Sequence, residues 1–87
     1  MGYNWGVTVT ILLFASVAEA AGQRRLEVQS APGDTVESVC DRLMTSHPQL
    51  ARFRPSLLFA VDEEYVKPTA PVPAGATLAL IPPVSGG

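Results

Sequence analysis

A single stretch of the chain, Asp34 to Ser46, has the spacing of a long amphipathic helix. Asp34 and Glu37 have the spacing of a capping box, and Pro48 ends the pattern, because the residue before a proline avoids helical geometry. The apolar residues recur three and four positions apart, and the stripe consists of Val36, Val39, Cys40, Leu43 and Met44. One such helix must bury its stripe against another layer, and the rest of the chain supplies strands.

The other apolar segments have the spacing of strands. The first alternates and then becomes continuous in "ILLF", which is typical of a central strand that has a parallel neighbour and is covered on both faces at one end. In the last, Leu78 and Leu80 share one face, while Ala79 and Ile81 share the other. The predicted strands cover residues 7–14, 24–30, 56–61, 65–67 and 76–82.

Shorter features connect these strands. Ser16 and Glu19 have capping-box spacing and Gly22 suits a left-handed C-cap, so a short helix is predicted over Ser16–Ala21. The segment "PTAPVPAG" holds three prolines, which cannot join a central ladder, and it predicts a surface loop. An irregular turn after Pro48 is expected to tuck in an apolar side chain or two, at Leu50 and Phe53.

The elements run strand, helix, strand, helix and then three strands. This order predicts an α+β fold of the β-grasp type, with a mixed sheet of about five strands, one main helix and one short helix after the first strand. We expect residues 1–6 to be an N-terminal extension, residues 7–81 to form the domain and residues 82–87 to form an extended tail.

Composition excludes several classes of function. Formal net charge is −2 and the basic residues are scattered, which predicts no nucleic-acid partner. Cys40 is the single cysteine and His47 the single histidine, so a disulfide framework and a zinc site are excluded. Cys40 fits helix-core packing, and His47 fits a helix end, where the helix dipole favours a cation. The run Asp62-Glu63-Glu64 is interpreted as a solvated turn, so we expect neither a metal site nor catalytic side chains of the chain's own.

The N-terminal run "GVTVTILLFASVA" admits two interpretations. It is followed by "AEA", which resembles a signal-peptidase site, but no Lys or Arg precedes it. The run is also shorter than the roughly 20 residues that cross a bilayer. We therefore expect a buried strand rather than a secretory signal, no membrane contact, and a place in the cytosol.

The sequence closes with "IPPVSGG", whose chemistry lies in its carboxylate. A carboxylate anion repels nucleophiles, and conversion to an acyl adenylate gives it a good leaving group. Gly86 and Gly87 lack Cβ atoms, so catalytic groups of another enzyme can approach the backbone closely. Pro82 and Pro83 hold the base of the tail extended, which lowers the cost of ordering it in a narrow site. Val84 and Ser85 form the stem between the two pairs.

The tail "PPVSGG" resembles the C-terminus of the small, sulfur-carrier subunits of molybdopterin synthase. The segments "LLFASVAEAAG", "LLFAVDEEYV" and "GATLALIPPVSGG" are similar to the same family, so the resemblance covers nearly the whole chain from Val7. Ala18 stands where bacterial members carry a charged residue, and a salt bridge there is not expected.

The resemblance implies a β-grasp fold like that of ubiquitin, and sulfur transfer from Gly87. An activating enzyme of the E1 type would adenylate this carboxylate with magnesium and ATP, and a sulfurtransferase system would make a thiocarboxylate. The large synthase subunit, which holds the catalytic lysines, would accept the tail and pass the sulfur to cyclic pyranopterin monophosphate. The resemblance implies a heterotetramer of two small and two large subunits. No permanently bound cofactor is implied, only the transient adenylate at Gly87.

The resemblance also places apolar contacts to the large subunit at Phe14, Tyr65 and Ile81. Ordinary core packing is the competing interpretation for Phe14 and Ile81. Tyr65, beside an acidic turn, has the character of an interface residue.

Three other functions stay open. A related carrier for thiamine or transfer-RNA thiolation would use the same terminal chemistry, although thiamine carriers tend to lack the short helix and the Pro-Pro exit. A ubiquitin-like modifier would be joined to lysines. A plain interaction or secreted domain would make no use of the tail.

Overall fold

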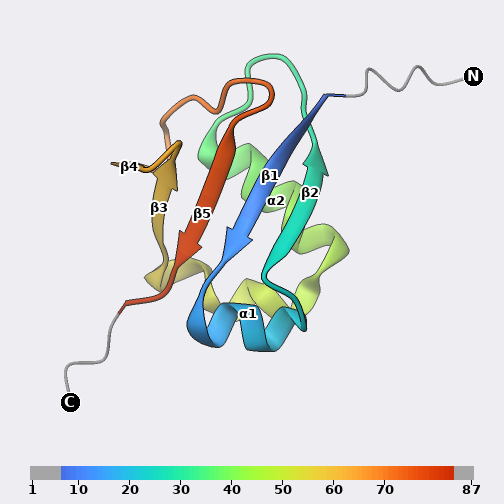
Figure 1. Cartoon of the computed structure of the whole chain (residues 1–87), viewed down its shortest axis with the longest axis vertical. Helices are drawn as coiled ribbons and strands as arrows, with labels where there is room; N and C mark the ends of the chain where they lie inside the picture. Colours follow the sequence, from blue (N-terminus) through green and yellow to red (C-terminus); the bar gives the residue numbers. More distant parts are fainter. Residues whose placement is uncertain (1–6, 84–87) are drawn as a thin grey trace, which may run out of the picture.

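A computed structural model describes residues 7–83, so the predicted extension 1–6 and the tail positions 84–87 lie outside the described residues. These residues form one mixed five-stranded sheet in the order β2-β1-β5-β3-β4. The strands are β1 (Thr8–Leu13), β2 (Arg25–Gln29), β3 (Leu58–Val61), β4 (Glu64–Val66) and β5 (Thr77–Ile81). The helices are α1 (Ala15–Ala21), α2 (Val36–Ser46) and the 3₁₀ helix η1 (Pro48–Ser56). Figure 1 shows α2 crossing behind the sheet and α1 lying beneath its lower end. The predicted α+β, β-grasp order is confirmed.

β1 is a central strand, as predicted, since it pairs in parallel with β5 and antiparallel with β2. Its "ILLF" end, however, is not covered on both faces. Leu12 stays half-buried and Phe14 is 45% exposed. The continuous run therefore reflects an open face that is itself apolar. The covered side of β1 consists of Val9, Ile11 and Leu13.

The stripe predicted for the main helix forms the core beneath the sheet. Cys40 and Leu43 of α2 are almost fully buried, together with Leu78 and Leu80 of β5. Met44, at the edge of the stripe, is half-buried and packs against the same cluster. Because α2 packs these side chains against β5, the long helix fixes which face of the sheet is left uncovered.

The capping box of α2 lies one residue later than predicted. The Thr35 side chain accepts a hydrogen bond from the N–H of Ser38 at 3.2 Å, and the Ser38 hydroxyl accepts one from the N–H of Thr35 at 2.8 Å. The predicted Asp34–Glu37 box is wrong because the Asp34 carboxylate is buried and accepts hydrogen bonds from Arg42. Arg42 thereby ties the helix to the preceding turn.

The short helix also begins earlier than predicted. Phe14 is its N-cap residue and no side chain caps it, so the predicted Ser16–Glu19 box is wrong. Ser16 lies within the first turn, where its hydroxyl cannot replace a cap. The predicted C-cap is confirmed, because Gly22 adopts φ 76° and donates its N–H to the carbonyl of Ala18 at 2.9 Å.

Two connections are more ordered than the sequence suggested. The turn after Pro48 is the 3₁₀ helix η1, with Leu50 buried and Phe53 half-buried. The proline-rich segment 68–75 lies partly inside the fold, since Val72 is buried. Carbonyls of this segment accept hydrogen bonds from the first free N–H groups of α2. These N–H groups need partners outside the helix, which explains why the segment is held against it.

Candidate functional site: the open face of the sheet and the exit of the tail

A row of paired residues crosses the face of the sheet that α2 leaves open. Strand pairing places Leu12, Ala79, Ala60 and Tyr65 side by side, from β1 through β5 and β3 to β4. Arg25 of β2 pairs with Leu12 at the other end of this row. The two small alanines stand between larger side chains, so the open face has a shallow depression along its middle.

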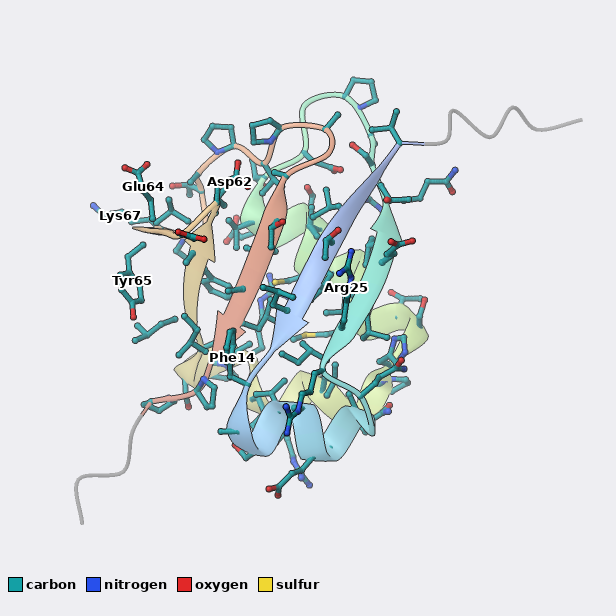
Figure 2. The ribbon with its side chains drawn as sticks, viewed as in Figure 1. Phe14, Arg25, Asp62, Glu64, Tyr65 and Lys67 are labelled. Atoms are coloured by element: carbon teal, nitrogen blue, oxygen red, sulfur yellow. The ribbon has the colours of Figure 1, made fainter. Side chains whose placement is uncertain are left out.

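The three predicted contact residues meet at this face. Phe14, Tyr65 and Ile81 all line one open hollow of about 580 Å³. Phe14 is 45% exposed and Tyr65 is 72% exposed, while Ile81 is partly buried. The core interpretation of Phe14 is therefore wrong, and Ile81 lies on the open face rather than against α2. Figure 2 shows Phe14 beyond the end of β1 and Tyr65 at the opposite flank, on β4.

Sequence reasoning missed a further apolar residue of this face. Leu58 is 50% exposed and pairs directly with Ile81, so it lies at the end of the sheet where β5 finishes. The signal was present in "SLLFAV", because the alternation that buries Phe59 places Leu58 on the opposite face. We call the exposed or half-buried apolar residues Leu12, Phe14, Leu58, Tyr65 and Ile81 the apolar face.

An acidic hairpin borders the apolar face on one side. Asp62 and Glu63 form the turn between β3 and β4, and both have positive φ, 48° and 73°. The backbone N–H of Asp62 donates a hydrogen bond to the carbonyl of Thr77 at 2.9 Å. One carboxylate oxygen of Asp62 accepts a second hydrogen bond, from the N–H of Thr77, at 3.0 Å. The interpretation as a merely solvated turn is thus incomplete, because Asp62 pins the hairpin to the start of β5.

Charged side chains stand at both flanks of the open face. Figure 2 shows Arg25 on the β2 side, with Asp62 and Glu64 on the side of the hairpin. The face therefore presents an apolar centre between charged borders, which is the anatomy of a protein interface.

The chain leaves the sheet at the end of this face. β5 ends at Ile81, and Pro82 and Pro83 follow without regular structure. The predicted tail positions Val84, Ser85, Gly86 and Gly87 lie outside the described residues.

The other residues considered from sequence do not form a site. Cys40 is fully buried, and this burial raises the pKa of its thiol to about 11. His47 is the C-cap residue of α2, as predicted, and the 3₁₀ helix follows it directly. Within residues 7–83 there is no group of His, Cys, Asp and Glu side chains that could hold a metal ion. In the same range, every helix is too short or too polar to cross a membrane.

Comparison with known proteins finds a family model and several relatives that match this chain. The model of the ThiS family matches residues 11–87. The molybdopterin synthase sulfur carrier subunit of Arabidopsis thaliana is 36% identical over 81 residues, covering 93% of this chain and 84% of that protein. The human protein of the same name is 34% identical over 82 residues, covering 91% of this chain and 93% of its own.

Solved structures show the same fold. A crystal structure of SAMP1 from Haloferax volcanii has a TM-score of 0.83 and 33% identity, and covers 92% of this chain and 99% of that one. Subunits of a molybdopterin-converting factor from Helicobacter pylori were solved as a complex, and one chain matches with a TM-score of 0.66 over 92% of this chain and 99% of its own. At 16% identity that match supports the fold alone.

Proposed function

Because this chain belongs to the ThiS family, and its curated relatives are sulfur carrier subunits of molybdopterin synthase, we propose that it carries sulfur on Gly87 for molybdenum cofactor biosynthesis. The observation that carries the proposal is geometric. Phe14, Tyr65 and Ile81 lie on one uncovered apolar face, and β5 ends at that face just before the tail. A partner seated there would be in position to receive the tail.

The proposed cycle begins with activation. An enzyme of the E1 type, using magnesium and ATP, joins AMP to the Gly87 carboxylate and releases pyrophosphate. A sulfurtransferase system then replaces AMP by sulfur and leaves a thiocarboxylate. Gly86 and Gly87 let the activating enzyme close around the backbone, because neither has a side chain. No cofactor stays bound in this scheme.

Transfer would follow on the large subunit. A cysteine thiol is mostly protonated near neutral pH, whereas a thiocarboxylic acid is far more acidic, so its sulfur is an anion ready to attack. The tail would deliver it to cyclic pyranopterin monophosphate, with two carriers supplying the two sulfurs of the dithiolene. The chain acts as a co-substrate, the catalytic lysines belong to the large subunit, and two small and two large subunits assemble in the cytosol.

The apolar face suits partner binding because little conformational entropy is lost when its contacts form. All of its residues except Phe14 lie on paired strands, so few backbone conformations are lost when a partner binds. The stiff exit through Pro82 and Pro83 lowers the ordering cost of the tail in the same way.

A reconstituted reaction tests the proposal. The thiocarboxylated chain, mixed with a molybdopterin synthase large subunit and cyclic pyranopterin monophosphate, is expected to yield the dithiolene product. The same chain extended by one residue after Gly87 should fold normally and give none. Transfer to a thiazole precursor of thiamine, with none to the pterin, would favour the related carrier instead.

A second function is favoured by one comparison. Two crystal structures of SAMP1, the small archaeal modifier protein 1 of Haloferax volcanii, are 33% and 31% identical to this chain over nearly the full length of each. We therefore keep protein modification as the alternative. Stable conjugates in cell lysates that disappear on deletion of Gly87 would support it.

A further inference from the structure

The chain carries a single side-chain amine. Of its six Lys and Arg residues, one is a lysine, Lys67, and the others are arginines. A guanidinium keeps its proton at any physiological pH and does not attack carbonyl groups, whereas a lysine amine can. This matters if Gly87 is activated as proposed above, because an acyl adenylate reacts with amines and thiols as well as with its intended sulfur donor.

The thiol of the chain cannot compete for the activated terminus. Cys40 is fully buried in α2, and burial raises its pKa to about 11, so almost none of it is thiolate near neutral pH. An acyl group would have to enter the core to reach it. Lys67 is therefore the side chain of this fold with both the chemistry and the access to be acylated.

Lys67 also lies where another chain can approach. It is exposed and directly follows β4, which is an edge strand of the sheet. Tyr65, two residues earlier, lines the hollow of the apolar face, so Lys67 stands at its border. Figure 2 shows Lys67 close to Glu64 and Tyr65, at the opposite edge of the sheet from Arg25. The two ion pairs found within residues 7–83 do not involve it.

We propose that Lys67 is the acceptor through which one copy of this chain is linked to the activated C-terminus of a second copy. The Nζ atom of Lys67 attacks the Gly87 carbonyl, the C–N bond forms, and the bond from the carbonyl to the phosphate oxygen breaks. AMP leaves and the amine gives its proton to water, so the product is an isopeptide bond. The fixed φ of Pro82 and Pro83 stiffens the exit of the tail, which favours a second copy over the same copy.

Whether the Lys67 linkage forms should depend on the partner and on the sulfur donor. A partner seated on the apolar face would cover its border and shield the amine. A sulfur donor would compete for the same adenylate. The linkage is therefore expected from carrier that is activated but has neither partner nor sulfur, and it would remove such carrier from the transfer cycle.

The test uses the full chain with Gly87 converted to a thioester by intein cleavage, so that neither the activating enzyme nor ATP is needed. In this reaction the Lys67 amine displaces the thiol. A covalent dimer is expected on denaturing gels, and fragmentation should map the new bond to Lys67. Once the thioester left on the acceptor copy has been hydrolysed, the intact mass of the dimer should equal two chains less one water. The matched variant is Lys67→Arg, which keeps the positive charge and removes the nucleophile.

The dimer should be lost in Lys67→Arg while the thermal unfolding curve stays unchanged. A thioester that hydrolyses without forming dimer would overturn the inference. A dimer that persists in Lys67→Arg, linked through the N-terminal amine, would also overturn it. So would a product one water lighter than a single chain, since that mass means that the linkage formed within one copy. Because activation is chemical, each of these results concerns Lys67 and leaves the proposed adenylation of Gly87 to its own test.

Discussion

The guanidinium of Arg42 donates to both carboxylate oxygens of Asp34, at 2.7 and 3.1 Å, and joins the middle of α2 to the turn before it. The Asp34 side chain is 3% exposed and that of Arg42 is 36% exposed. The hydrogen bonds from Arg42 lower the pKa of Asp34 and raise that of Arg42. This pair stands at the end of the sheet away from the tail, so it can be altered without touching the proposed site.

Asp34→Asn is expected to destabilise the fold by about 2 kcal/mol, since it weakens hydrogen bonds to a charged group in a buried position. The folded pKa of Asp34 lies below its unfolded value of 3.8, so the pair contributes stability above pH 3.8. That contribution is lost as the pH falls from 3.8 through the folded pKa. Urea unfolding of both proteins across this range checks the sign.

The difference in unfolding free energy between wild type and Asp34→Asn should shrink over that acidic range. A difference that stays constant down to low pH would contradict the assignment of the ion pair. Asp41→Asn is the matched control, because its pair with Arg54 is exposed and is expected to change stability by well under 1 kcal/mol.

Truncation of the apolar face should weaken partner binding without unfolding the carrier. Phe14→Ala and Tyr65→Ala each remove an exposed aromatic ring from the hollow, and such anchors cost about 2 kcal/mol or more when lost from an interface. Calorimetric titration with a molybdopterin synthase large subunit measures the loss. Val7→Ala is the control, since Val7 is 37% exposed, directly precedes β1 and does not line the hollow. Equal losses from all three would show that the face is not where the partner binds.

Gly22→Ala should cost roughly 1 kcal/mol from backbone strain alone. Gly22 has φ 76°, in the left-handed region, and a Cβ at this position would meet no atom within 4 Å. The melting temperature of the variant gives the cost. No loss of stability would contradict the left-handed C-cap that ends α1.

The Cys40 thiol should resist modification in the folded chain. It is fully buried and its pKa is raised to about 11, so a disulfide reagent at pH 8 should label it only after denaturant is added. Rapid labelling of the native chain would show that the core opens locally, and it would also remove the basis for treating Lys67 as the accessible nucleophile.

Periodicity predicted the order of the elements because it follows from which faces are buried. The stripe of α2 and the alternation of Leu78, Ala79 and Leu80 gave the correct faces. Caps were predicted less well, since Asp34, Thr35 and Ser38 are all polar residues able to begin a helix. The choice among them depended on Arg42, eight residues beyond Asp34 in the sequence.

The site was predicted from resemblance more than from pattern. Nothing in the spacing of Phe14, Tyr65 and Ile81 indicates that they meet, because they come from three segments that lie far apart in the sequence. Strand pairing brings them together. Leu58 could have been added from the alternation in its own strand, but only once the covered face was known.

The central claim is that Gly87 becomes a thiocarboxylate, and an intact-mass measurement tests it directly. The chain is incubated with an E1-type activating enzyme, magnesium, ATP and a sulfur source, and the product is fragmented. The account predicts exchange of one oxygen for one sulfur, located at Gly87 and absent when ATP is omitted. An unchanged mass, under conditions in which the enzyme activates a known carrier, would contradict it.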